Sequence, residues 1–345
     1  MEIETPGAPA QAAPGNAQGG TICLRPFARF AWFAAALSLA FCVPLYGLVR
    51  LAFHSSLYSH VLLIPFITFY LIWIRRGELL TLGGTGVSPV ASFPSGASVP
   101  PAPHLLSSSP SASPDFRVSA SAALPLALGA LLLAGYWVAR WRGWPPATED
   151  YLCITILSFV LLLAAGGFVF LGGPFMKAVA FPAAVLLFMA PFPTVGKNGI
   201  EMFFQHTSAD AASVIFSVSG TPFFREGLVF HLPGMTITVA EECSGIRSSL
   251  VLFITGLLAA HLFLVTPWKR AVLALFVIPL GIVRNGFRIF TIGMLCVHVD
   301  PSMIDSPIHH RGGPIFFLLS LIPFFLILFF LRRSEQPARR RTTDD

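Results

Sequence analysis

The stretch "TVAEECSGIRSSLVLFITGLLAAHLFL", residues 238–264, changes from polar to apolar within a few positions. Two acids, a thiol and an arginine lie between Glu241 and Arg247. The apolar run that follows has about the 18–20 residues that are needed to cross a bilayer. We therefore predict a membrane-spanning helix over about 245–264, with a cluster of polar side chains at its entrance.

The composition extends this prediction to the whole chain, which has 345 residues, of which 55% are hydrophobic and 11% charged. In a typical soluble domain about a quarter of the residues are charged. We expect an all-α polytopic membrane protein with about eight transmembrane helices. The apolar runs cover about 29–49, 58–74, 120–139, 151–171, 176–192, 245–264, 271–291 and 314–331.

Basic residues at the ends of these runs predict the topology, because cytoplasmic loops are enriched in Lys and Arg. Placing Arg75–Arg76 in the cytoplasm also places Lys269–Arg270, Arg332–Arg333 and both termini there. Arg140 and Arg142 fall on the opposite side, against the bias. The net charge of +6 is explained by such anchors, so nucleic-acid binding is not indicated.

Changes in composition divide the chain into five parts. We expect a disordered cytoplasmic tail over 1–28, an N-terminal transmembrane pair over 29–76, a disordered Gly/Ser/Pro linker over 77–119, a six-helix membrane body that would be the catalytic part over 120–331, and a basic cytoplasmic tail over 332–345.

The longest outward-facing segment of this topology, residues 193–244, precedes the opening stretch. Its first part has the spacing of an amphipathic helix that lies on the membrane surface. "LVFHL" and "MTITVA" then alternate in polarity on either side of Pro233–Gly234, which predicts a small outward-facing β-hairpin. The hairpin would deliver Cys243 to the start of the span over 245–264.

Two arginines lie inside the predicted span over 271–291, where a charge costs roughly 2.5–3.5 kcal/mol and therefore suggests a function. Arg284 and Arg288 are one helical turn apart. At about 1.5 Å per residue, Arg288 lies about 27 Å from Arg270, near the outer boundary. His309 and His310 precede the last span at the same boundary, which also holds Cys243.

These groups form a coherent chemical set. The dipole of a helix N-terminus and a nearby guanidinium favour a thiolate, an imidazole can exchange the protons, and an arginine can stabilise an oxyanion. Structural explanations remain open for each residue alone: Arg288 could extend to lipid headgroups, the histidines could be solvated, and Glu241 and Glu242 could be charges at a helix N-terminus.

No cofactor and no metal are expected. The five cysteines are scattered without a CxxC pair, so the sequence suggests neither a disulfide framework nor a zinc site.

Several segments resemble one family. "VAEECSGIRSS" resembles the signature around the active-site cysteine of the exosortase/archaeosortase family, which are membrane-embedded cysteine transpeptidases for C-terminal sorting signals. The family's Asn-x-x-Arg element is matched by Asn285 and Arg288, and its His with a Gly four residues later by His309 and Gly313. "YSHVLLIPFITFYLIWIRR", "FMAPFPTVGKN" and "FFREGLVFHLPG" are also similar to family segments.

The resemblance implies roles for individual residues. Cys243 would be the nucleophile, Arg288 the catalytic arginine and His309 the catalytic histidine. His310, Arg284, Asn285 and Glu242 are supporting candidates, and His310 is an alternative to His309.

The resemblance also implies an activity and partners. The chain would be a membrane cysteine endopeptidase/transpeptidase in a bacterial inner membrane, with its active site facing the periplasm. It would cleave exported proteins that end in a short motif, a transmembrane helix and a basic tail, through a Cys thioester. Membrane lipid surrounds it, and the acceptor would be a surface polysaccharide or a lipid.

Two other classes stay open. A multi-pass transporter or channel with an intramembrane arginine would not need the thiol, although no internal repeat of the span pattern is evident. A glutamate-based intramembrane metalloprotease has a Glu-Glu-xxx-Arg signature, but four residues separate Glu242 from Arg247 here, and the thiol would have no role.

Overall fold

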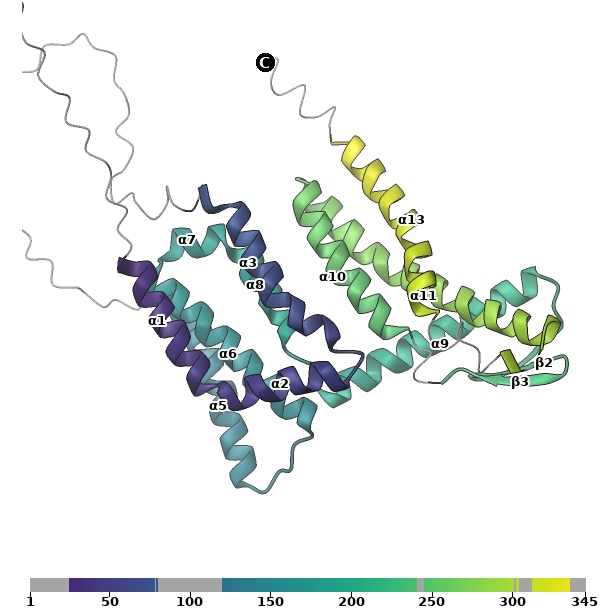
Figure 1. Ribbon diagram of the computed structural model, residues 1–345, viewed down its shortest axis with the longest axis horizontal. Helices are drawn as coiled ribbons and strands as arrows, with labels where there is room; N and C mark the ends of the chain where they lie inside the picture. The colour runs from purple at the N-terminus through teal and green to yellow at the C-terminus, as the bar shows by residue number, and fades with distance from the viewer. Residues whose placement is uncertain are drawn as a thin grey trace, which may run out of the picture. The chain divides into compact units, whose positions relative to one another are not determined.

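The computed structural model describes residues 25–77, 79, 120–240, 245–300, 302–303 and 312–335 (Figure 1). It divides into two compact units, which are described separately. The first comprises the described parts of residues 1–41, 66–131 and 158–187, and the second those of 42–65, 132–157 and 188–345. Helices dominate both, and a three-stranded antiparallel sheet lies in the second. The predicted class, a polytopic helical membrane protein with a small β-hairpin, is confirmed.

Five helices within the described residues are long and apolar enough to cross a membrane. They are α5 (Ala120–Trp141), α6 (Thr148–Phe170), α10 (Ile246–Phe263), α11 (Pro267–His298) and α13 (Gly313–Arg333). Two bent helix pairs raise the number to seven if each pair is one span. The sequence had suggested about eight.

Proline explains where the predicted continuous runs are broken. The run over 29–49 is α1 (Arg25–Ala40) and α2 (Cys42–His54), bent by 73°, because Pro44 has no N–H to donate to the carbonyl of Ala40. The run over 176–192 consists of α7 (Gly173–Ala178), α8 (Ala180–Val185) and η2 (Leu186–Met189). A bend of 91° then leads into α9 (Thr194–Val218), across Pro191 and Pro193. The run over 58–74 is a shorter apolar helix made of η1 (Ser59–Leu63) and α3 (Ile64–Ile74).

The first unit has a core of its own around the short helix α7. Leu79, Phe175, Met176 and Val179 form this cluster. Arg75 of the predicted cytoplasmic anchor donates to the carbonyl of Ala178 at 3.3 Å, which satisfies an acceptor at the end of α7.

In the second unit, α9 packs along α11 instead of presenting all its faces to a membrane surface. The helix predicted in this segment is confirmed, but Phe204, Ala209, Ala212 and Phe216 are buried. Gly286 permits the close approach, since a Cβ there would lie 2.7 Å from Cβ of Ala211.

The sheet covers the end of this helix pair (Figure 1). β2 (Val229–Leu232) and β3 (Met235–Thr238) form the predicted hairpin, and β1 (Phe224–Glu226) adds a third strand on the far side of β2. The turn uses Gly234 with φ of 83°, a conformation that glycine adopts without strain. Phe216 of α9, Phe230 of β2 and Ile289 of α11 share one core, so the sheet is fixed to both helices.

α10, α11 and α13 share another core. α10 contributes Leu252, Ala259 and Ala260, α11 contributes Leu273 and Val277, and α13 contributes Phe324 and Leu328. The residues after α13 close one end of this bundle. The carboxylate of Glu335 accepts from the N–H groups of Val265 and Thr266 at 3.0 and 2.9 Å, and Lys269 donates to Ser334 at 2.8 Å. The basic ends predicted to share one membrane face therefore meet at one end of the bundle.

Candidate functional site

The predicted site residues divide into two groups. Arg284, Asn285 and Arg288 lie on α11 within the described residues. Glu242 and Cys243 lie in 241–244, and His309 and His310 in 304–311, outside the described residues. The geometry of the site is therefore built from the residues that flank these two segments and from the α11 face.

The residue before the cysteine segment is held by the sheet and by α9. The N–H of Val239 donates to the carbonyl of Leu228 at 3.0 Å, which extends the hairpin by one pair. The side chain of Gln205 on α9 donates to the carbonyl of Val239. Val239 is buried, so the chain enters the cysteine segment from a fixed point.

Gly245 fixes the other side of the segment. Its φ of 74° lies in the left-handed region, which favours glycine because it has no Cβ. Its carbonyl accepts from the backbone N–H of Ser249, from the hydroxyl of Ser248 and from Nη2 of Arg284, at 3.0, 3.1 and 3.3 Å. A Cβ at Gly245 would lie 2.8 Å from Cγ of Asn285. The start of α10 therefore rests directly on the middle of α11.

Arg284 is the centre of this contact. It is buried, with 7% of its surface exposed, and a buried guanidinium is costly unless its N–H groups are bonded. Its Nη2 donates to Oγ of Ser249 at 3.0 Å as well as to Gly245. Its Nη1 makes no hydrogen bond to another described residue. Arg284 therefore joins α11 to the first turn of α10, and its Nη1 can still donate a hydrogen bond there.

Arg288 lies one turn further along α11 and is half-buried. Beside it, Phe287 packs edge-on against Phe316 of α13, with ring centroids 6.3 Å apart. Phe316 is three residues after Gly313, the glycine that follows the histidine pair. The start of α13, which follows the histidine segment in the sequence, therefore contacts the α11 turn that carries Arg288.

Two residues that the sequence reasoning missed complete the contact. Ser249 accepts from Arg284, and Gly281 leaves room for it, because a Cβ at Gly281 would lie 2.6 Å from Oγ of Ser249. The sequence signal available was weak: one of several serines in "SGIRSS" and one of several glycines on α11.

Comparison with known protein families identifies the chain. The family model described as transmembrane exosortase matches residues 50–326. The chain belongs to the transmembrane exosortase family. Neither the curated proteins nor the solved structures gave a match.

Membership of this family establishes a multi-pass membrane protein and implies a transpeptidase whose substrates carry C-terminal sorting signals. The match includes the cysteine segment, the α11 arginines and the histidine pair. It confirms the family resemblance that was inferred from the sequence.

Proposed function

We propose that this exosortase-family protein cleaves the C-terminal sorting tails of exported proteins through a thioester on Cys243. Arg288 and His309 would be the other catalytic residues, and the six-helix body over 120–331 the catalytic part. The site would face the periplasm at the outer boundary of a bacterial inner membrane. The observation that carries the proposal is the anchorage of Gly245 on Arg284 and Asn285 of α11.

Covalent geometry limits how far the nucleophile can lie from this anchor. Cys243 is two positions before Gly245, and an extended chain covers at most about 3.6 Å per residue. The Cα of Cys243 is therefore within about 7 Å of the Cα of Gly245, whatever the conformation of the segment. This limit supports the proposal that the thiol acts beside the α11 turns of Asn285 and Arg288.

The register of α10 against α11 favours Arg288 over Arg284 as the catalytic arginine. Ser249 lies opposite Gly281, and Gly245 lies opposite Asn285, so the two segments run antiparallel with a four-residue step on each. On α11, Arg288 lies beyond Asn285 in the direction away from Ser249, which supports its assignment as the catalytic arginine. Arg284 lies back toward Ser249 and is already bonded there.

The histidine segment is limited in the same way. His309 is three residues before Gly312, so its Cα is within about 11 Å of the Cα of Gly312. The contact between Phe316 and Phe287 holds the start of α13 beside the arginine turn. An imidazole side chain can therefore reach the region between Cys243 and Arg288.

The proposed reaction moves one proton and one acyl group. The imidazole of His309 takes the thiol proton, and the thiolate of Cys243 attacks the scissile carbonyl carbon. Arg288 stabilises the oxyanion with its fixed donors. The C–N bond then breaks, the leaving amine takes the proton from the imidazolium, and a thioester remains. An acceptor hydroxyl or amine, or water, attacks the thioester and frees the thiolate.

Arg284 and Asn285 act as positioning residues in this proposal. They hold Gly245, and through it the cysteine segment, and they have no place in the bond-making steps. Replacing Arg284 should therefore lower the fraction of molecules in which the thiol is in place. Replacing Arg288 should remove the charge that stabilises the oxyanion in every molecule.

The test co-expresses the full chain with a substrate that ends in a sorting motif, an apolar span and a basic tail. Cys243→Ala, Cys243→Ser and Arg288→Gln should each abolish processing at unchanged amounts of protein in the membrane. His309→Ala should abolish processing, while His310→Ala, the matched control in the same doublet, should retain most of it. Hydroxylamine, a nucleophile that attacks thioesters, should release the cleaved substrate as a hydroxamate, and it should do so only when Cys243 is present.

Continued processing by Cys243→Ala would overturn the proposal. If His310→Ala fails and His309→Ala works, the nucleophile stands and the assignment of the histidine is wrong. If Arg284→Gln is as inactive as Arg288→Gln and Arg284→Lys restores nothing, Arg284 is not merely a positioning residue.

A further inference from the structure

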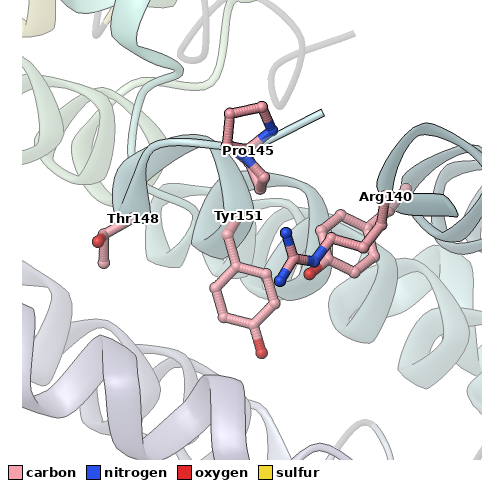
Figure 2. A pocket seen from close by; sticks show the side chains of 6 residues that line it. Arg140, Pro145, Thr148 and Tyr151 are labelled. Carbon is pink, nitrogen blue, oxygen red and sulfur yellow. The ribbon is translucent and has the colours of Figure 1, made fainter. Parts of the chain in front are cut away.

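The turn between α5 and α6 borders an open, shallow pocket that the proposed reaction does not use. The cavity has a volume of about 320 Å³, within the range of roughly 300–1,000 Å³ that is typical of small-molecule sites. The lining residues are Tyr136 and Arg140 at the end of α5, Pro145, Pro146 and Thr148 in the turn, and Tyr151 on α6. Figure 2 shows Arg140 extending from the end of α5 toward Tyr151. We propose that this pocket binds the phosphate of a phospholipid headgroup.

The charge in the pocket is not neutralised by its neighbours. Arg140 forms no ion pair with a described residue. The two acids that follow Thr148 are engaged with the start of α9: Glu149 pairs with Lys197 at 2.9 Å, and Asp150 accepts from the N–H of Thr194 at 2.7 Å. The pocket therefore presents a guanidinium to an incoming anion, with the competing carboxylates directed elsewhere.

The other polar groups suit a phosphodiester. The rings of Tyr136 and Tyr151 lie 5.4 Å apart at 46°, and both tyrosines line the same pocket as Arg140 and Thr148. Guanidinium donors match phosphate oxygens in pairs, and hydroxyl groups add single donors. Two prolines without N–H donors form the rest of the wall.

The surroundings indicate that the phosphate belongs to a lipid. Trp137, Trp141 and Trp144 are exposed around the turn, by 64%, 88% and 40%, and tryptophan is enriched where a membrane meets water. α5 itself is the least buried of the five single-helix spans: 11% of its apolar window is buried, against 22–50% in the other four. A headgroup in the pocket would leave its acyl chains along this exposed apolar helix.

The pocket gives a role to one of the two arginines that oppose the positive-inside bias. Both side chains are exposed, but Arg140 lines the pocket and Arg142 does not. The pair thus provides a matched comparison, because both changes remove one positive charge from the same turn.

The experiment measures lipid retention by native mass spectrometry on the full-length protein in detergent, titrated with dioleoyl phosphatidylglycerol. Dioleoylglycerol, which has the same chains and no phosphate, and inorganic phosphate are the two comparison probes. Arg140→Gln should weaken the tightest lipid-binding event by about tenfold, the size expected for one charge-assisted contact. Arg142→Gln should change it less than twofold, and Arg140→Lys should be intermediate, because it keeps the charge and loses the planar fork.

Three results would overturn the proposal: equal effects of Arg140→Gln and Arg142→Gln, equal retention of dioleoylglycerol, or no saturable binding event. If inorganic phosphate binds as tightly as the lipid and displaces it, the pocket is a small-anion site and the lipid assignment is wrong. Thermal unfolding of each variant in detergent verifies that a loss of binding is not a loss of fold. None of the described residues that line the pocket belongs to the proposed catalytic set, so processing activity is a separate readout.

Discussion

Gly245→Ala is the sharpest perturbation that the structure offers, because two independent costs fall on one added methyl group. The backbone at this position has φ of 74°, where an L-residue with a Cβ is disfavoured by roughly 1–2 kcal/mol. The new Cβ would also lie 2.8 Å from Cγ and 2.9 Å from Oδ1 of Asn285. Asn285 is only 2% exposed, so it has little room to move away.

The two costs together decide the expected size of the effect. Overpacking a tight contact costs typically 1–3 kcal/mol, so the sum is about 2–5 kcal/mol if the helices keep their places. The chain can avoid this cost by lifting the segment before α10 off α11. At about 1.4 kcal/mol per factor of ten, a cost of about 3 kcal/mol leaves less than roughly one molecule in a hundred with the segment in its native position.

The assay is the initial rate of tail cleavage in membranes that contain the full chain and a tailed substrate, normalised to the amount of folded enzyme. Gly245→Ala should lower this rate by about a hundredfold. Gly227→Ala is the matched control, because Gly227 has φ of 59° and nothing within 4 Å of a built Cβ. It carries the backbone strain without the clash and lies in the β1–β2 turn, so the rate should fall little. Equal rates for the two variants would show that the anchorage of Gly245 is not needed for the reaction.

Two further changes test the helix packing and the closed end of the bundle. Gly286→Ala places a Cβ 2.7 Å from Cβ of Ala211 and 3.0 Å from the backbone nitrogen of Ala212. This overpacking should cost about 1–3 kcal/mol and lower the unfolding temperature in detergent. An unchanged temperature would contradict the tight contact between α9 and α11. Burial acts to raise the pKa of Glu335, but the N–H groups of Val265 and Thr266 outweigh it and bring the pKa below the ordinary 4.5. The carboxylate therefore stabilises the fold above that range and loses this effect as the pH falls through the lowered pKa. Glu335→Gln should thus lower the unfolding temperature at neutral pH, and this difference should disappear as the pH falls through the lowered pKa. A difference that persists in acid would contradict this assignment.

Hydropathy predicted the helices and missed their breaks for a definite reason. An apolar run reports how much lipid-compatible surface a segment has, and α6, α10 and α13 fall within a few residues of their predicted positions. It does not report whether each carbonyl has a donor four residues later. Pro44, Pro191 and Pro193 remove such donors, and there the chain turns by 73° and 91°.

In the sheet, too, local sequence patterns predicted some elements and missed another. Pro233–Gly234 between two alternating segments was sufficient to predict β2 and β3. β1 has three residues, Phe224–Glu226, too few for a period-two pattern to stand out. Its place is decided by tertiary contacts, among them the ion pair of Arg225 with Asp210 on α9 at 2.7 Å.

The candidate site was predictable as a set of residues and not as a set of roles. Spacing alone placed Arg284, Asn285 and Arg288 on neighbouring turns. It left open whether Arg284 binds substrate or supports Arg288, because that depends on which residue of α10 lies opposite each turn. The hydrogen bonds to Ser249 and Gly245 supply this register, and they assign Arg284 to the helix contact.

The length of α11 accounts for the depth at which this chemistry can lie. The helix has 32 residues and is therefore about 48 Å long, while the hydrocarbon core of a bilayer is about 30 Å thick. If Pro267 marks one boundary, the other falls about twenty residues later, between Asn285 and Arg288. The remaining residues, from Ile289 onward, pack under the sheet and need no lipid around them. A guanidinium at this boundary escapes most of the cost of a charge at the bilayer centre, and in the proposed function a nucleophile there would meet a substrate helix from the lipid and an acceptor from water.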